Sequence, residues 1–189
     1  MGTDKALLEL EGQTLVGIAL GTLREFCAEV AIAGSRPDLA GLAAVIPDLR
    51  PDCGPAAALE AGLAACGQPW GMFVPVDVPR VPAELLRRWA EFVLASGPGV
   101  PLASYLRAGG REQPAFCLLR RELAGEMGEM VGAGERRLMG LWRGLAAAHG
   151  AAAVLAVDAE ELGGGGPAEV ADWFENLNTP EDLRRIATR

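Results

Sequence analysis

The sequence has few of the groups from which proteins build metal centres and disulfide frameworks. It holds a single histidine, His149, and the four cysteines are widely spaced and form no Cys-x-x-Cys pair. Neither a zinc site nor a set of disulfides is therefore predicted. Nucleophilic acyl transfer is poorly supported as well, because no cysteine has a suitable histidine partner and no Gly-x-Ser-x-Gly motif occurs.

Long apolar runs and an excess of positive charge are also missing. No apolar run approaches the roughly 20 residues needed to cross a bilayer, and residues 1–5 lack the apolar core of an export signal. The chain carries 17 basic against 25 acidic side chains, for a net charge of −8. Such a balance argues against affinity for phosphate backbones. We therefore predict a soluble, cytoplasmic protein with neither a membrane nor a nucleic acid as its partner.

Short apolar runs alternate with helical spacing along the 189 residues, whose number favours one domain over residues 1–189. Strands are predicted over residues 29–33, 42–46, 70–76, 100–106, 114–118 and 152–157. Helices are predicted over residues 13–26, 56–66, 83–94, 120–131, 136–149 and 180–187. The alternation predicts an α/β fold in which a mostly parallel sheet is flanked by helices.

Polar residues that directly follow the apolar runs are the candidates for a site, because ligands bind at the carboxyl ends of parallel strands. Asp77 follows the run 70–76, and a single carboxylate there suits Mg²⁺, which fills its remaining positions with water and substrate phosphates. The alternative is an aspartate that caps the following turn. Asp48 follows the run 42–46. It either lies at the same edge of the sheet as Asp77 or is an ordinary turn residue. Lys5, taken alone, is a solvated charge.

Short segments of the chain also stand in an ordered series. They are Met1-Gly2-Thr3-Asp4-Lys5-Ala6-Leu7-Leu8-Glu9-Leu10, Val45-Ile46-Pro47-Asp48 followed by Gly54-Pro55, Phe73-Val74-Pro75-Val76-Asp77-Val78-Pro79, residues 134–139 and residues 176–183. In this order the segments resemble those of the molybdenum cofactor guanylyltransferase family. The spaced combination spans nearly the whole chain and is more specific than any one motif.

The resemblance implies a Rossmann-like nucleotidyltransferase fold and an Mg²⁺-dependent enzyme that joins the GMP part of GTP to the phosphate of molybdopterin. By position, it implies that Lys5 contacts the GTP phosphates, that Asp48 contacts GTP and that Asp77 binds the magnesium ion. Asn178 matches an asparagine near the family's site. Molybdoenzyme maturation proteins are further partners that the resemblance suggests.

The sequence departs from the family pattern at its start. It begins inside the nucleotide signature, so the first strand and the glycine-rich turn, whose amides should cradle the triphosphate, are absent. We expect that the natural product starts upstream and that Met1 is an internal methionine. The alternative is a non-catalytic nucleotidyltransferase-like module. A cytidylyltransferase acting on the same cofactor is a further alternative, although relatives that use CTP usually carry a residue other than Val78 after the metal aspartate.

Overall fold

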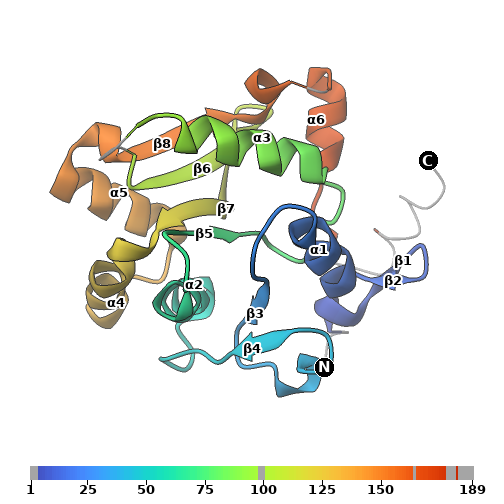
Figure 1. The fold of residues 1–189 in the computed structure, drawn as a ribbon, viewed down its shortest axis with the longest axis horizontal. Coiled ribbons are helices and arrows are strands. Elements are labelled where there is room, and N and C mark those ends of the chain that lie inside the picture. The colour runs from blue at the N-terminus through green and yellow to red at the C-terminus, as the bar shows by residue number, and fades with distance from the viewer. Residues whose placement is uncertain (1–3, 98–100, 164, 178–181, 183–189) are drawn as a thin grey trace.

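The chain alternates short strands with helices (Figure 1). A computed structural model describes residues 4–97, 101–163, 165–177 and 182. The strands are β1 (Glu9–Leu10), β2 (Gln13–Thr14), β3 (Ala31–Ala33), β4 (Ala44–Ile46), β5 (Trp70–Phe73), β6 (Ala103–Ala108), β7 (Arg111–Arg120) and β8 (Val154–Asp158). The α-helices are α1 (Leu15–Arg24), α2 (Gly54–Ala65), α3 (Ala83–Leu94), α4 (Ala124–Gly132), α5 (Leu138–His149) and α6 (Pro167–Trp173). Short 3₁₀ helices are η1 (Lys5–Leu7), η2 (Pro37–Leu39), η3 (Arg121–Leu123), η4 (Ala151–Ala153) and η5 (Ala159–Leu162).

The predicted α/β class is confirmed, and most elements lie where the apolar spacing places them. Helix α3 covers the predicted range 83–94, whereas α1 is shorter than the predicted range 13–26. The hydroxyl of Thr14 accepts a hydrogen bond from the amide of Gly17 at 3.2 Å, and this cap fixes the start of α1. The helix predicted over residues 180–187 falls almost wholly outside the described residues.

The larger sheet has four strands in the order β5–β7–β6–β8. Strands β6 and β8 are parallel, whereas β7 is antiparallel to both of its neighbours, β5 and β6. Three of the four strands share one direction, but two of the three pairings are antiparallel because β7 runs the opposite way. The sheet is therefore mixed, whereas a mostly parallel sheet without a β6–β7 hairpin was predicted. Gly109 and Gly110 form the turn of this hairpin with φ of 55° and 69°, and glycine adopts such positive angles without steric cost.

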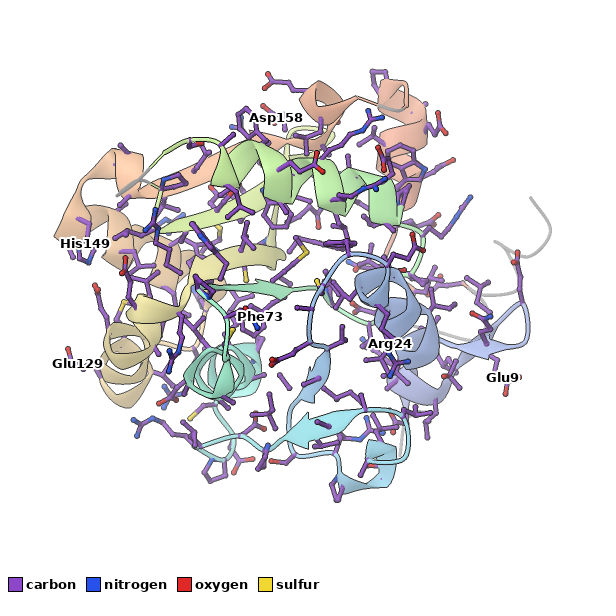
Figure 2. The ribbon with its side chains drawn as sticks, in the orientation of Figure 1. Glu9, Arg24, Phe73, Glu129, His149 and Asp158 are labelled. Atoms are coloured by element: carbon purple, nitrogen blue, oxygen red, sulfur yellow. The ribbon has the colours of Figure 1, made fainter. Side chains whose placement is uncertain are left out.

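Strands β3 and β4 form a separate parallel pair below the larger sheet in Figure 1. Among the described residues, neither β3 nor β5 has a second strand neighbour, and every residue of β5 is partly exposed. Helix α2 packs against both strands: a Cβ added to Gly62 would lie 3.5 Å from Cβ of Ala33 and would overlap the ring of Phe73, which Figure 2 labels. Among the described residues, no strand joins β3 to β5.

Helices cover the larger sheet on both faces. Along β7, Cys117 and Leu119 pack with α2, α4 and α5, whereas Phe116 and Leu118 pack with α3 and α6. This alternation follows from the two-residue period of a strand. Burial raises the pKa of the Cys117 thiol, so this cysteine is an unreactive core residue. Within the described residues, no helix is long and apolar enough to cross a bilayer.

Candidate functional site

Asp77 lies in the connection from β5 to α3. The connection begins after Phe73, so Asp77 is separated from the strand by residues 74–76, which were predicted to belong to it. Its neighbour Val78 is 5% exposed and packs in the core with α3, whereas the side chain of Asp77 is 27% exposed. Burial of Val78 therefore anchors the turn and leaves the carboxylate accessible from solvent.

Lys5 lies beside Asp77. Its Nζ is 3.9 Å from Oδ2 of Asp77, although 72 positions separate the two residues in the sequence. Lys5 opens the short helix η1, and the Asp4 carboxylate caps this helix by accepting a hydrogen bond from the amide of Ala6 at 3.1 Å. The cap fixes the backbone from which the lysine side chain extends. The structure thus brings two of the four predicted site residues into direct electrostatic contact.

Asp48 lies two residues beyond the end of β4 and is held by the segment that follows β3. Its amide donates a hydrogen bond to Oγ of Ser35 at 3.2 Å, and the Ser35 hydroxyl lies 3.5 Å from Oδ2 of Asp48. The other carboxylate oxygen, Oδ1, is buried and has no hydrogen-bond partner within the part of the chain that the structure describes. A buried acceptor without a donor is costly, and an oxygen closed to the surface can meet a ligand only if the Asp48 side chain turns.

Arg36 joins the Lys5 segment to the Asp48 segment. Its guanidinium donates to both carboxylate oxygens of Asp4, with Nη1 at 3.1 Å from Oδ1, and Nε donates to Asp38 at 3.0 Å. The hydrogen bond from Arg36 lowers the pKa of the Asp38 carboxyl below its usual value. Arg36 thus ties Asp4, the neighbour of Lys5, to the segment whose Ser35 contacts Asp48.

The roles of Asp4, Ser35 and Arg36 in this network were missed at the level of sequence. The segment Gly34 to Arg36 directly follows β3, and polar residues after a strand are the signal that selected Asp48 and Asp77. Applied to β3, the same rule would have selected Ser35 and Arg36. The contact of Arg36 with Asp4 spans 32 positions, and no local pattern reveals it.

Asn178 lies outside the described residues, but Leu177 is described. The amide of Leu177 donates a hydrogen bond to the backbone carbonyl of Asp77 at 2.7 Å. The Leu177 side chain is fully buried, in a small cluster with Leu8, Leu10 and Leu15. This cluster packs the end of the described chain against the segment that carries Lys5, beside the Asp77 turn.

The Asp77 turn offers few ligand groups to a metal ion. Within the described ranges, no group of three or more histidine, cysteine, aspartate or glutamate side chains is arranged to hold a metal ion. Asp77 offers one accessible carboxylate. A single carboxylate fits a hard divalent cation that takes its remaining ligands from water and from substrate phosphates. It does not fit a tightly held structural ion such as zinc.

A surface hollow lies away from the predicted site residues. It has a volume of about 440 Å³ and is formed by α4, by the connection that follows it and by the first turns of α5. Its lining residues are Met130, Ala133, Gly134, Glu135, Gly140 and Gly144. None of the predicted site residues lines it, although residues 134–139 belong to one of the segments that carry the family resemblance.

The fold is that of a nucleotide-transferring enzyme. Molybdopterin-guanine dinucleotide biosynthesis protein A from Archaeoglobus fulgidus has a solved structure that aligns with a TM-score of 0.75 at 22% identity. The alignment covers 99% of this chain and 90% of that one. At this identity the likeness establishes the fold, a Rossmann-like nucleotidyltransferase type.

The family follows from the sequence relatives. Residues 1–153 match the MobA-like NTP transferase domain. A molybdenum cofactor guanylyltransferase from Cereibacter sphaeroides is 38% identical over 97% of this chain and 86% of its own length. One from Serratia proteamaculans is 34% identical over 97% of this chain and 85% of its own length. The chain therefore belongs to the MobA-like NTP transferase family, which confirms the resemblance drawn from its motifs.

Proposed function

We propose that this protein transfers GMP from GTP to the terminal phosphate of molybdopterin and releases pyrophosphate. The observation that carries the proposal is the contact of Lys5 with Asp77, 3.9 Å apart at the ends of two distant segments. It puts a cation and a candidate metal ligand side by side where a triphosphate would lie. The names of the relatives, molybdenum cofactor guanylyltransferases, supply the nucleotide and the acceptor.

In the proposed reaction a phosphate oxygen of molybdopterin attacks the α-phosphorus of GTP. A new P–O bond forms, the bond from the α-phosphorus to the bridging oxygen breaks, and the electron pair leaves with pyrophosphate. Two anions must approach each other, so the protein lowers the barrier by alignment and by positive charge near the phosphates. The Lys5 ammonium would hold the triphosphate, and no protein nucleophile is needed.

Asp77 is the residue that would hold a divalent cation, and we propose Mg²⁺. The accessible carboxylate fits this ion because Mg²⁺ commonly binds through one or two carboxylates together with substrate phosphates. When bound, the ion supplies Lewis-acid stabilisation of the phosphate oxygens and of the leaving group. The turn anchored by Val78 holds the Asp77 carboxylate in place for this role.

Asp48 favours guanine over cytosine in this proposal. A guanine base presents two adjacent donors, the N1–H and the 2-amino group, to which a carboxylate is complementary. Cytosine presents a single amino group beside an acceptor nitrogen, which a carboxylate repels. The guanine donors would meet the Asp48 carboxylate once its side chain turns to expose Oδ1, which is buried and without a hydrogen-bond partner among the described residues. A contact between Asn178 and the substrate remains part of the proposal, on the family position of Asn178 alone.

The proposal is tested by incubating the protein with GTP, Mg²⁺ and molybdopterin and measuring dinucleotide and pyrophosphate. Product from GTP, with CTP failing to compete at equal concentration, is the expected result. Preferential use of CTP would transfer the assignment to a cytidylyltransferase. If neither nucleotide yields product, calorimetric titration with GTP and Mg²⁺ separates a binding module from a protein with no nucleotide site.

Replacing Lys5 by methionine should weaken the apparent affinity for GTP by roughly 10- to 100-fold, because a hydrogen bond between charged groups is lost. Lys5 is the one lysine of the 189-residue sequence, so loss of its ammonium is not masked by a neighbouring lysine. The measurement is KM for GTP in the pyrophosphate-release assay.

The matched control is Arg87→Met, which removes an exposed cation on α3 that pairs with Glu84. We expect this variant to keep the KM of the unaltered protein. Equal KM values for Lys5→Met and Arg87→Met would exclude Lys5 from the nucleotide site.

A further inference from the structure

Glu60 is a buried carboxylate that the proposed chemistry does not use. Among the described residues, Glu60 and Ser104 are the two buried polar residues, and Glu60 alone carries charge. It lies on α2 with 3% of its surface exposed, and both of its carboxylate oxygens are 3.1 Å from Nε of Arg50. A buried carboxylate is costly unless it is paired. Arg50 supplies the pairing for Glu60, and the question is what this buried ion pair does for the protein.

Arg50 belongs to the loop of residues 47–53, which joins β4 to α2 and carries Asp48. Besides its contacts with Glu60, the Arg50 guanidinium donates from Nη2 to the backbone carbonyl of Gly128 on α4 at 3.3 Å. The loop backbone is unusual, because Asp52 has φ of 58°, a region that residues other than glycine rarely adopt. Such a conformation persists when surrounding contacts hold it, and Arg50 supplies contacts to two helices.

Helix α4 is built to accommodate this pair. A Cβ at Gly128 would lie 3.1 Å from Oε1 of Glu60, and a Cβ at Gly132 would lie 3.5 Å from Nη2 of Arg50. Glycine lowers helix stability relative to alanine, yet two glycines stand one turn apart on the face that meets the pair. The Glu60–Arg50 pair explains why glycine stands at position 128, because the Cβ of an alanine there would crowd the Glu60 carboxylate.

From these contacts we infer that the Glu60–Arg50 pair positions the nucleotide-binding loop. The pair fixes residues 47–53 against α2 and α4, and thereby sets the place of Asp48, which Ser35 holds from the other side. The inference rests on the proposed function, because it assigns Glu60 and Arg50 as positioning residues for GTP binding. In this assignment neither residue contacts the substrate, so their loss should act on KM for GTP and leave kcat nearly unchanged.

The test is a double-mutant cycle on Arg50→Met and Glu60→Gln with the GTP-dependent pyrophosphate assay. Each single variant is expected to raise KM for GTP about fivefold or more, within the range by which residues remote from a ligand alter binding. The double variant should be no worse than Arg50→Met alone, because both changes break one bridge. Additive effects, or a fall in kcat with KM unchanged, would overturn the inference.

Gly128→Ala perturbs the bridge without removing a charge, and Gly125→Ala is its control on the same helix, where an added Cβ meets nothing within 4 Å. We expect Gly128→Ala to raise KM for GTP and Gly125→Ala to leave it unchanged. Ser104→Ala, which removes a buried hydroxyl bonded to Trp89, controls for general destabilisation and should also leave KM unchanged. A rise in KM for Ser104→Ala equal to that for Glu60→Gln would overturn the inference.

The hydrogen-exchange rate of the Asp48 backbone amide tests the same inference in the absence of substrate. Faster exchange is expected in Arg50→Met and Glu60→Gln, and an unchanged rate would overturn the positioning role even if the unaltered protein makes dinucleotide from GTP. Lack of turnover by the unaltered protein would instead refute the proposed function, and the exchange rates would still decide whether the bridge holds the loop.

Discussion

Replacing Asp77 by asparagine is expected to lower turnover by a factor on the order of 10² or more while the protein stays folded. Asparagine has nearly the same size and shape as aspartate, and the side chain is 27% exposed, so the substitution creates neither a cavity nor a clash. What it removes is the negative charge that would hold the divalent cation, together with the attraction to Lys5. The measurement is kcat for pyrophosphate release at saturating GTP and Mg²⁺.

Asp158→Asn is the matched control for this prediction. Asp158 is the last residue of strand β8, and its side chain is 29% exposed and paired with Arg107 at 2.6 Å. The control thus removes a carboxylate of similar exposure that also contacts a cation but lies outside the candidate site. We expect Asp158→Asn to change kcat by no more than a few fold. If Asp77→Asn keeps full turnover, the Asp77 carboxylate has no part in the mechanism.

The positions of the site residues follow largely from local sequence features. Apolar runs identify strands, and the polar residue after a run lies at the strand's carboxyl end, which is how Asp48 and Asp77 were selected. The family resemblance added Lys5, which the local pattern alone assigns to solvent. The structure places Lys5 within 3.9 Å of Asp77, a contact between segments 72 positions apart that no local pattern shows.

Features that depend on pairing between distant segments were not predictable in the same way. The local pattern indicates the strands at β6 and β7, but the antiparallel insertion of β7 between β5 and β6 is a matter of tertiary pairing. The adjacent glycines Gly109 and Gly110 are a turn signal that the sequence-based prediction did not use. The Arg36–Asp4 and Arg50–Glu60 contacts leave no such signal, because side-chain charges at these positions equally fit solvent.

Replacing Trp89 by alanine is expected to lower the free energy of unfolding by about 3–5 kcal/mol. Trp89 is fully buried on α3 and belongs to the same core cluster as Val78, the residue that anchors the Asp77 turn. Its indole N–H also donates to Oγ of the buried Ser104 at 3.0 Å, so alanine leaves both a cavity and a hydroxyl without its donor. The measurement is urea unfolding, followed by circular dichroism and extrapolated to water.

Phe92→Ala, three positions further along α3, separates the effect of burial from the loss of an aromatic ring. Phe92 is 52% exposed, and substitutions at such surface positions usually change stability by about 0.5 kcal/mol or less. If both variants unfold at the same urea concentration, the face of α3 that carries Trp89 does not pack in the core between α3 and the sheet. If only Trp89→Ala is destabilised, we expect its folded fraction to bind Mg²⁺ and GTP more weakly than the unaltered protein does. The reason is that the core cluster that holds Val78, and with it the Asp77 turn, is loosened.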